Sequence, residues 1–196
     1  MVEYQPHAIA EYRPVLSAES DEILAARAAT DPAAFAELYN RYVARIDGYC
    51  RQRLHSADLA EDATHQIFLR ALESLRKHPV DNVAAWLFTI AHNECIDRYR
   101  RHRAHVPIEM AVEMEGIERS PEDQAIARSM VRELWDLLPL LGEDQRQVLE
   151  LRLAGLSSGE IEIVLGKSRS WVGVTQHRAV LRLRALMGVP AIPKER

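Results

Sequence analysis

The side chains best suited to binding chemistry lie near the C-terminus, where basic and hydroxyl residues recur at helical spacing. Arginine and histidine pair with phosphate oxygens, while serine, threonine and tryptophan contact base edges. A helix that carries both kinds of side chain fits the major groove of duplex DNA. The residues predicted to bind DNA in this way are Ser168, Arg169, Ser170, Trp171, Thr175, His177, Arg178 and Arg182.

The segment around these residues predicts a helix-turn-helix. Ser157 and Glu160 have the spacing of a capping box, which begins a short helix. Gly166 supplies the turn, because glycine adopts a left-handed conformation without steric cost. Ser168 is the expected cap of the second helix. The residues expected to face inward are Ile161, Val164 and Leu165 in the first helix and Val172, Ala179, Val180 and Leu183 in the second.

A second basic group ends a long helix that Asp81 is predicted to cap. It holds Arg98, Arg100, Arg101 and Arg103 with His102 and His105, and Asp97 is the only acid expected close by. Upstream lie Trp86, His92, Asn93 and Tyr99. Arginines that bind phosphates and rings that stack bases suit a single nucleic-acid strand. A solvated basic helix end, favoured by the helix dipole, explains the same residues. The residues alone leave both interpretations open.

Acidic residues gather where another helix begins, after Ser56. Asp58, Glu61 and Asp62 all lie in its first two turns. They complement the positive end of the helix dipole, and they also offer a docking surface to a basic partner. Both roles remain open at this point.

These groups sit in an all-α fold: two small helical domains joined by a flexible acidic linker, the C-terminal one containing the helix-turn-helix. Apolar residues at three- and four-residue steps predict helices over about 21–29, 31–54, 56–78 and 81–104. His78-Pro79 is expected to end the third of these, and further helices follow from about 122, with breaks at Pro139 and Gly142. The predicted divisions are a flexible arm at 1–19, a domain at 20–104, the linker at 105–121, a domain at 122–187 and a tail at 188–196.

Composition limits the function classes. The 196 residues carry a net charge of −4, so any DNA contact must use local basic patches. The chain's two cysteines, Cys50 and Cys95, fall in apolar helical patterns and are expected to be buried thiols. No disulfide framework, signal peptide or membrane-spanning apolar run is present, which favours a reducing cytoplasm and no membrane insertion.

Three ordered stretches resemble the extracytoplasmic-function (ECF) branch of the sigma-70 family, which are bacterial RNA polymerase initiation factors. The resemblance covers about residues 20–187. The matching stretches are Ala60 to Ala71, Trp86 to Arg101, and, after the linker, Leu138-Pro139, Arg146 to Arg152 and the helix-turn-helix as far as Arg178-Ala179.

The resemblance implies a division of labour. The first domain corresponds to sigma region 2, which docks on the clamp helices of the polymerase β′ subunit through Glu61, Asp62, Gln66, Leu69 and Arg70. The loop at 76–82, with Asn93, Asp97, Arg98 and Arg101 beside it, is expected to bind the melted −10 element. The residues expected to do so are Lys77, His78, Asn82, Trp86, Asn93, Asp97, Arg98 and Arg101.

By the same resemblance, the second domain corresponds to sigma region 4. Its helix-turn-helix is expected to bind the −35 element as duplex, and its other face to meet the β-subunit flap. The linker is expected to pass near the RNA exit path. An anti-sigma protein is a further candidate partner, and no region 3 domain is recognised, as in the ECF branch.

Several positions depart from the family pattern. His65-Gln66 stands where Gln-Glu or Gln-Asp is usual, and Glu162 replaces a small alanine. Trp171 stands where threonine is common, and Gly173-Val174 replaces basic or hydroxyl residues. Promoter preference is therefore not carried over from relatives.

The sequence disfavours two other function classes. A stand-alone helix-turn-helix regulator binds palindromes as a dimer, but it leaves residues 20–104 unexplained. An enzyme is disfavoured because the chain lacks the HExxH zinc spacing, a glycine-rich phosphate loop, and a nucleophile near Glu61 and Asp62. No cofactor and no metal are predicted.

Overall fold

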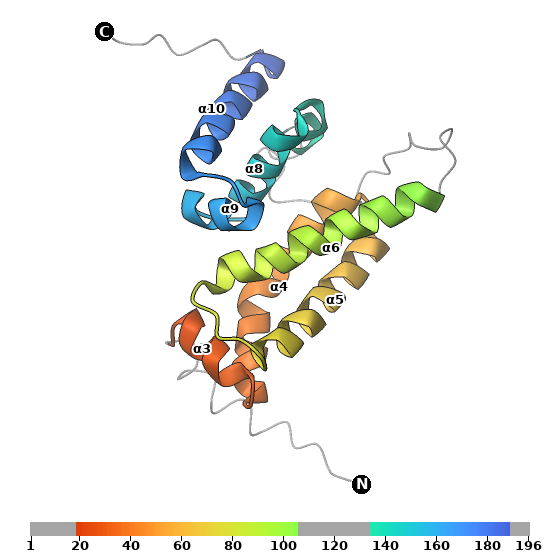
Figure 1. Ribbon diagram of the computed structural model, residues 1–196. Coiled ribbons are helices and arrows are strands. Elements are labelled where there is room, and N and C mark those ends of the chain that lie inside the picture. The colour runs from red at the N-terminus through yellow and green to blue at the C-terminus, as the bar shows by residue number, and fades with distance from the viewer. Residues whose placement is uncertain (1–18, 106–133, 189–196) are drawn as a thin grey trace, which may run out of the picture. The chain divides into compact units, whose positions relative to one another are not determined.

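The computed structural model describes residues 19–105 and 134–188, except for the side chains of 102–105. Every regular element within these two ranges is a helix, which confirms the predicted all-α class. The ranges belong to two compact units, which are considered separately (Figure 1). The predicted arm, linker and tail, and the helix expected from 122 as far as residue 133, lie outside the described ranges apart from single edge residues.

The described part of the first unit, residues 19–105, is a bundle of four helices. They are α3 (Asp21–Ala28), α4 (Pro32–Leu54), α5 (Ala57–Leu75) and α6 (Val83–His105). Helix α4 packs against the other three, and α5 also packs against α6 (Figure 1). Their shared core contains Leu24, Leu38, Ile46, Ile67, Leu87 and Phe88, each at most 2% exposed.

Side chains cap the starts of α4 and α5. The Asp31 carboxylate accepts hydrogen bonds from the Ala33 N–H at 2.9 Å and from Arg27 at 2.5 Å. The Arg27 hydrogen bond, followed by the backbone one, lowers the pKa of Asp31, so this carboxylate is stabilised in its charged form. Ser56 caps α5, where its hydroxyl accepts from Leu59 N–H at 3.4 Å.

The prediction that Asp81 caps the fourth helix was wrong. Asn82 does so instead, because its Oδ1 accepts from the Ala85 N–H at 2.8 Å, the third residue of α6. Helix α5 also ends at Leu75, before the predicted His78-Pro79 stop. The N–H groups of Lys77 and His78 both donate to the Ser74 carbonyl, which turns the chain early. The segment between the two helices is therefore 76–82.

The second unit contains the helix-turn-helix. Helical residues 134–137 lead into a short 3-10 helix, η2 (Leu138–Leu140). Then come α8 (Glu143–Leu153), α9 (Ser158–Leu165) and α10 (Arg169–Leu186), and α10 packs against both α8 and α9. A core of Leu138, Leu141, Leu149, Ala179 and Leu183 joins α10 to the segment that precedes α8.

The connection from α9 to α10 has the predicted local chemistry. The Ser157–Glu160 capping box is present in both directions, with Ser157 N–H donating to Glu160 Oε2 at 2.6 Å. Gly166 has φ 61°, in the left-handed region, and the following Lys167 N–H donates to the Glu162 carbonyl at 3.2 Å. These bonds end α9 and set the direction in which α10 begins.

We expect Gly166→Ala to lower the free energy of unfolding by roughly 1–2 kcal/mol, because a Cβ is strained at a positive φ. Gly159→Ala is the matched control, since Gly159 lies inside α9 and nothing is within 4 Å of its added Cβ. That substitution should raise the free energy by up to about 1 kcal/mol. Urea titration followed by circular dichroism measures both, and equal effects would contradict the assignment of the turn.

Candidate nucleic-acid and protein interfaces

Helix α10 presents a positively charged face to solvent. Its sequence contains four arginines and no acidic residue. Arg169 and Ser170 are exposed in the first turn, and His177, Arg178 and Arg182 are exposed further along. The exposed face of α10 thus has polar groups at its N-terminal end and cations after them. Duplex DNA is contacted by side chains of these two kinds.

For two residues of α10, the sequence predicted the wrong side of the helix. Thr175 is 8% exposed, so its placement on the DNA-facing side was wrong. Val180, predicted to face inward, is 41% exposed. Thr175 lies three residues after Val172 and four before Ala179, which places it on the same buried stripe. The exposed face instead includes two apolar residues that the sequence analysis missed, Val174 and Leu181, at 48% and 49% exposure.

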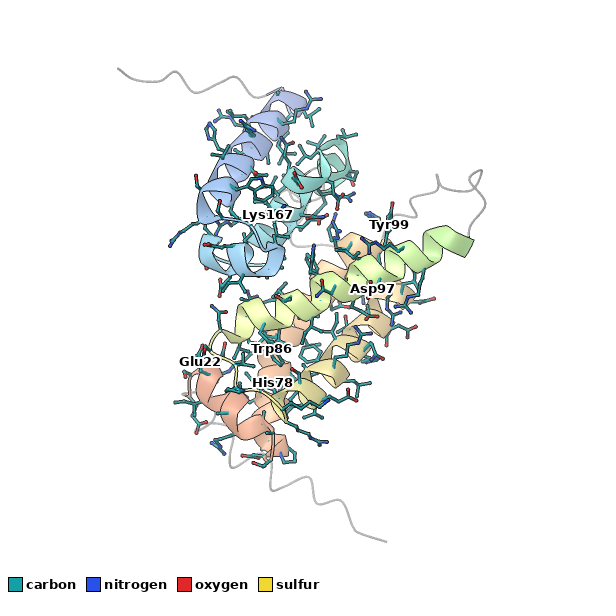
Figure 2. The ribbon with its side chains drawn as sticks, in the orientation of Figure 1. Glu22, His78, Trp86, Asp97, Tyr99 and Lys167 are labelled. Atoms are coloured by element: carbon teal, nitrogen blue, oxygen red, sulfur yellow. The ribbon has the colours of Figure 1, made fainter. Side chains whose placement is uncertain are left out.

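The start of α10 is ordered by its own side chains. The Ser168 hydroxyl accepts a hydrogen bond from Trp171 N–H at 3.2 Å, as an N-cap. The Lys167 ammonium lies 5.5 Å from the centroid of the half-buried Trp171 ring, a cation–π distance (Figure 2). Ser168 and Trp171 therefore hold the end of the helix as well as lying at its surface.

Arg152 of α8 ties the helix-turn-helix together. Its guanidinium donates to the Leu156 carbonyl at 2.7 Å, to Ser158 Oγ at 2.6 Å and to Gln176 Oε1 at 2.9 Å. One side chain thus joins the end of α8 to the starts of α9 and the middle of α10. In the sequence, Arg152 belongs to a stretch that resembles the family. Its contact with Gln176, 24 residues away, could not be predicted from sequence spacing.

Helix α5 exposes an acidic and apolar face. The Asp62 side chain is 71% exposed and Leu69 is 57% exposed, with the half-buried Gln66 between them. These three residues follow the four- and three-residue steps of one helix face. Glu61 is exposed beside them. A single exposed apolar side chain is common on protein surfaces, so the docking role expected for this face rests on the family resemblance.

The residues predicted to bind a melted strand do not form one group around the 76–82 loop. Lys77 and His78 are exposed in that loop, whereas Asn93 and Asp97 lie far along α6. Figure 2 shows His78 and Trp86 near one end of α6 and Asp97 toward the other. At the rise of an α-helix, Trp86 and Asp97 are about 16 Å apart. The expectation that Asn93, Asp97, Arg98 and Arg101 lie beside the loop was therefore wrong.

A strip along α6 replaces that cluster. Trp86, Asn93 and Asp97 are separated by seven and four residues, so they share one side of the helix. Asn93 and Asp97 are exposed and Trp86 is half-buried. Nearby His92 is different, since it is 7% exposed and its Nδ1 lies 2.9 Å from the Tyr49 hydroxyl. His92 is a core residue and does not belong to the strip.

A buried carboxylate organises the arginines at this end of the unit. Glu94 is 1% exposed, and its Oε1 accepts from Arg98 Nε at 2.7 Å. Its Oε2 lies 3.0 Å from Arg70 Nη1, and its Oε1 lies 3.9 Å from Arg101 Nη2. Arg98 Nη1 also lies 4.0 Å from Asp62 Oδ2. We name these five residues the Glu94 cluster. The expectation that Asp97 is the only acid near the arginines was wrong.

The two cysteines form a buried thiol pair between α4 and α6. The Cys95 thiol donates to Cys50 Sγ at 3.8 Å, and both side chains are at most 1% exposed. The hydrogen bond with Cys50 and burial raise the pKa of the Cys95 thiol far above its usual range. Both effects favour the protonated thiol over the reactive thiolate. Within the described ranges, no cluster of His, Cys, Asp and Glu could hold a metal ion.

Membrane insertion can be tested for the same part of the chain. Among the helices of residues 19–105 and 134–188, none is both long and apolar enough to cross a bilayer.

Comparison with known proteins places these surfaces in a family context. The family model Sigma-70 region 2 matches residues 38–105. The ECF RNA polymerase sigma factor BldN of Streptomyces coelicolor is 32% identical over 176 residues, which cover 87% of this chain and 67% of BldN. The RNA polymerase sigma factor YlaC of Bacillus subtilis is 33% identical over 159 residues, which cover 77% of this chain and 90% of YlaC.

A solved structure has the same fold. CnrH, determined in complex with the cytosolic domain of CnrY, aligns with a TM-score of 0.67 at 27% identity. The alignment covers 88% of this chain and all (100%) of CnrH.

Burial of the thiol pair predicts that Ellman's reagent labels neither cysteine of the folded protein at an appreciable rate, because labelling must wait for local opening. In 6 M guanidinium chloride, roughly the concentration that unfolds even very stable domains, both thiols should react at once. Rapid labelling of one thiol per folded chain would show that the Cys50–Cys95 contact does not persist in solution.

Proposed function

The chain belongs to the ECF sigma factors of the sigma-70 family, and we propose that three of its surfaces divide the work of a transcription initiation factor between them. It binds core RNA polymerase and directs it to promoters. The observation that supports this proposal is that a second set of exposed side chains suited to nucleic-acid binding, along α6, occurs in a unit separate from the helix-turn-helix. A stand-alone regulator has no use for that unit.

The first proposed surface is the open face of α10, which binds the −35 element as duplex. Arg169, Ser170 and Trp171 lie at the end of the helix that approaches base edges, and Arg178 and Arg182 follow where phosphates are met. The domain at 122–187 is assigned to sigma region 4 on this basis. Val174, exposed and apolar, adds a contact suited to a thymine methyl group.

The second proposed surface is the α6 strip with the 76–82 loop, which binds the melted −10 element. Trp86 offers a ring to an unstacked base, and the exposed Asn93 offers an amide to a base edge. Capture of unpaired bases offsets the free energy of strand separation, so opening needs no hydrolysis by this chain. The chain itself is therefore proposed to be non-enzymatic and to need no cofactor. The domain at 20–104 is assigned to region 2.

The third proposed surface is the α5 face of Asp62, Gln66 and Leu69, which docks on the clamp helices of the β′ subunit. Charge complementarity with a basic partner gives orientation, and the exposed Leu69 gives buried apolar area. The acidic linker at 105–121 and a contact with the β flap complete the proposed polymerase interface. Because polymerase and promoters are cytoplasmic, the proposed location is the cytoplasm.

An inhibitory protein is a further proposed partner. CnrH, similar to this chain, was solved with the cytosolic domain of CnrY bound. An anti-sigma protein that covers the α5 and α10 faces would block polymerase and promoter together.

The direct test mixes the purified chain with sigma-free core polymerase. Co-elution, followed by run-off transcripts from promoters selected out of a random library, is the expected result. A chain that fails to bind polymerase but binds duplex DNA tightly by itself would be a stand-alone regulator instead.

Asp62→Arg should abolish binding to core polymerase, because it places a positive charge where a basic partner docks. Asp62 is exposed, so the free energy of unfolding should change by less than about 0.5 kcal/mol. Glu22→Arg, an exposed charge reversal on α3, is the control and should bind normally. Competition with a labelled sigma factor for core polymerase measures both, and normal binding by Asp62→Arg would remove the α5 face from the interface.

Arg178→Ala should weaken holoenzyme binding to every −35 duplex by about fivefold and reduce the slope of log affinity against log salt by about one. Arg178→Lys should keep both near wild type, because the phosphate contact needs only a cation. Replacing Arg169, Ser170 and Trp171 with alanine should change which sequences a random library yields. The same selected sequence after that triple change would exclude them as base-contacting residues.

A further inference from the structure

Glu94 is the most costly charge to bury in the first unit, and none of the proposed contacts with polymerase or DNA uses it. Its side chain is 1% exposed. A carboxylate removed from water is strongly disfavoured unless cations and hydrogen bonds surround it. Arginines from two helices do so here: Arg70 from α5, and Arg98 and Arg101 from α6. The carboxylate in turn fixes where those guanidinium groups lie.

The hydrogen bonds leave part of each guanidinium available. Arg98 uses its Nε on Glu94, its Nη1 lies 4.0 Å from Asp62 Oδ2, and its side chain is 20% exposed. Arg101 uses its Nε on the Asp97 carbonyl at 3.2 Å, and its side chain is 65% exposed. A guanidinium has five N–H donors in a rigid plane, so fixing Nε fixes the direction of the others. The Arg101 fork is thus held at the surface of α6, and the partly exposed Arg98 guanidinium is fixed beside it.

The cluster also carries excess positive charge. Three guanidinium groups surround two carboxylates, those of Glu94 and of the exposed Asp62. A phosphodiester presents paired oxygens that match a guanidinium fork and supplies the missing negative charge. The cluster lies beside the Asp97 end of the α6 strip, along the proposed course of the melted strand.

We propose that Glu94 is a positioning residue for promoter opening: it holds Arg98 and Arg101 in the orientation that binds a backbone phosphate of the melted −10 strand. The inference rests on the proposed function of α6. The physical gain is pre-organisation, because two long side chains need not be ordered when the strand arrives. Through Arg70, the same carboxylate links this site to the helix that meets polymerase.

The direction in which Glu94→Gln changes strand affinity shows whether Glu94 acts by positioning the arginines or only through its negative charge. Glu94→Gln removes a negative charge close to a polyanion, so electrostatics alone would strengthen DNA binding. Loss of positioning weakens it. Glu73→Gln, which neutralises an exposed carboxylate of α5 outside the cluster, is the matched control and should leave binding unchanged or slightly tighter.

The test uses holoenzyme reconstituted from core polymerase and the full chain. Fluorescence anisotropy measures its affinity for a labelled single-stranded oligonucleotide that carries the −10 element. We expect Glu94→Gln to lower that affinity on the order of tenfold, with Glu94→Asp partly restoring it. Core affinity should stay within about threefold of wild type, since the α5 face remains. In an Arg98→Ala background, Glu94→Gln should add less than about twofold, because the residue that it positions is absent.

Unchanged or tighter strand binding by Glu94→Gln would overturn the inference. So would a parallel loss of core affinity, strand affinity and melting temperature, which would mark Glu94 as purely structural. If Glu94→Gln does not fold, Arg98→Lys decides the matter: it keeps the charge without the fork, so full strand affinity would overturn the inference and weakened affinity would support it. Failure of the wild-type holoenzyme to bind the oligonucleotide would instead overturn the proposed function of α6.

Discussion

Helix α10 can present Ser170 and Arg178 to solvent only because Val172, Ala179 and Leu183 are buried on its other side. The same constraint governs α5, where burial of Ala63 and Ile67 leaves Asp62 and Leu69 outside. Each helix has one apolar stripe, and the period of 3.6 residues fixes every other position relative to that stripe. The binding surfaces are therefore consequences of the cores. A change that rotated a helix by one residue would move its whole surface away from its partner.

Apolar packing sets which face is outside, but it does not set how arginine side chains lie on that face. Buried polar contacts perform this second task in both units. Glu94 fixes the arginines of α5 and α6, and Arg152 fixes α9 and α10 through a carbonyl, a hydroxyl and an amide. Charge-assisted hydrogen bonds of this kind have strict geometry, and a missing partner leaves a buried charge unpaired. Each unit thus combines a tolerant apolar core with one geometrically demanding polar contact.

The sequence predicted local features well because their causes are local. The Ser157–Glu160 capping box and the Gly166 turn involve atoms three or four residues apart, and the structure contains both. The predicted cap of α6 was wrong by one residue: Asp81 was predicted, and Asn82 caps the helix. Both side chains can cap a helix, and only the direction of the backbone decides between them. Thr175 was misplaced because a hydroxyl suggests a surface, whereas its spacing from Val172 and Ala179 indicates the core.

The Glu94 cluster could not be predicted from spacing, because Arg70 and Asp62 reach it from a different helix. The same limit explains why residues 93–101 were wrongly placed beside the loop: a family pattern in the sequence does not reveal that α6 carries Asp97 about 16 Å from Trp86. Long-range pairing depends on how α5 and α6 cross, which side-chain packing decides. One part of the cluster could have been predicted: Glu94 lies four residues before Arg98, the spacing at which a glutamate and an arginine pair on a helix.

The distribution of charge along the chain bears on how a sigma factor can prefer promoters over other DNA. The whole sequence has a net charge of −4, so its cations are local and its background repels DNA. At physiological salt, charges are screened beyond about 8 Å, and a phosphate senses mainly the nearest arginines. Neither α10 nor the α6 strip then needs to bind tightly by itself. On the proposed function, the two contacts are joined in one chain and held on polymerase, so they reinforce each other through effective concentration and favour a promoter with both elements over DNA with either one alone.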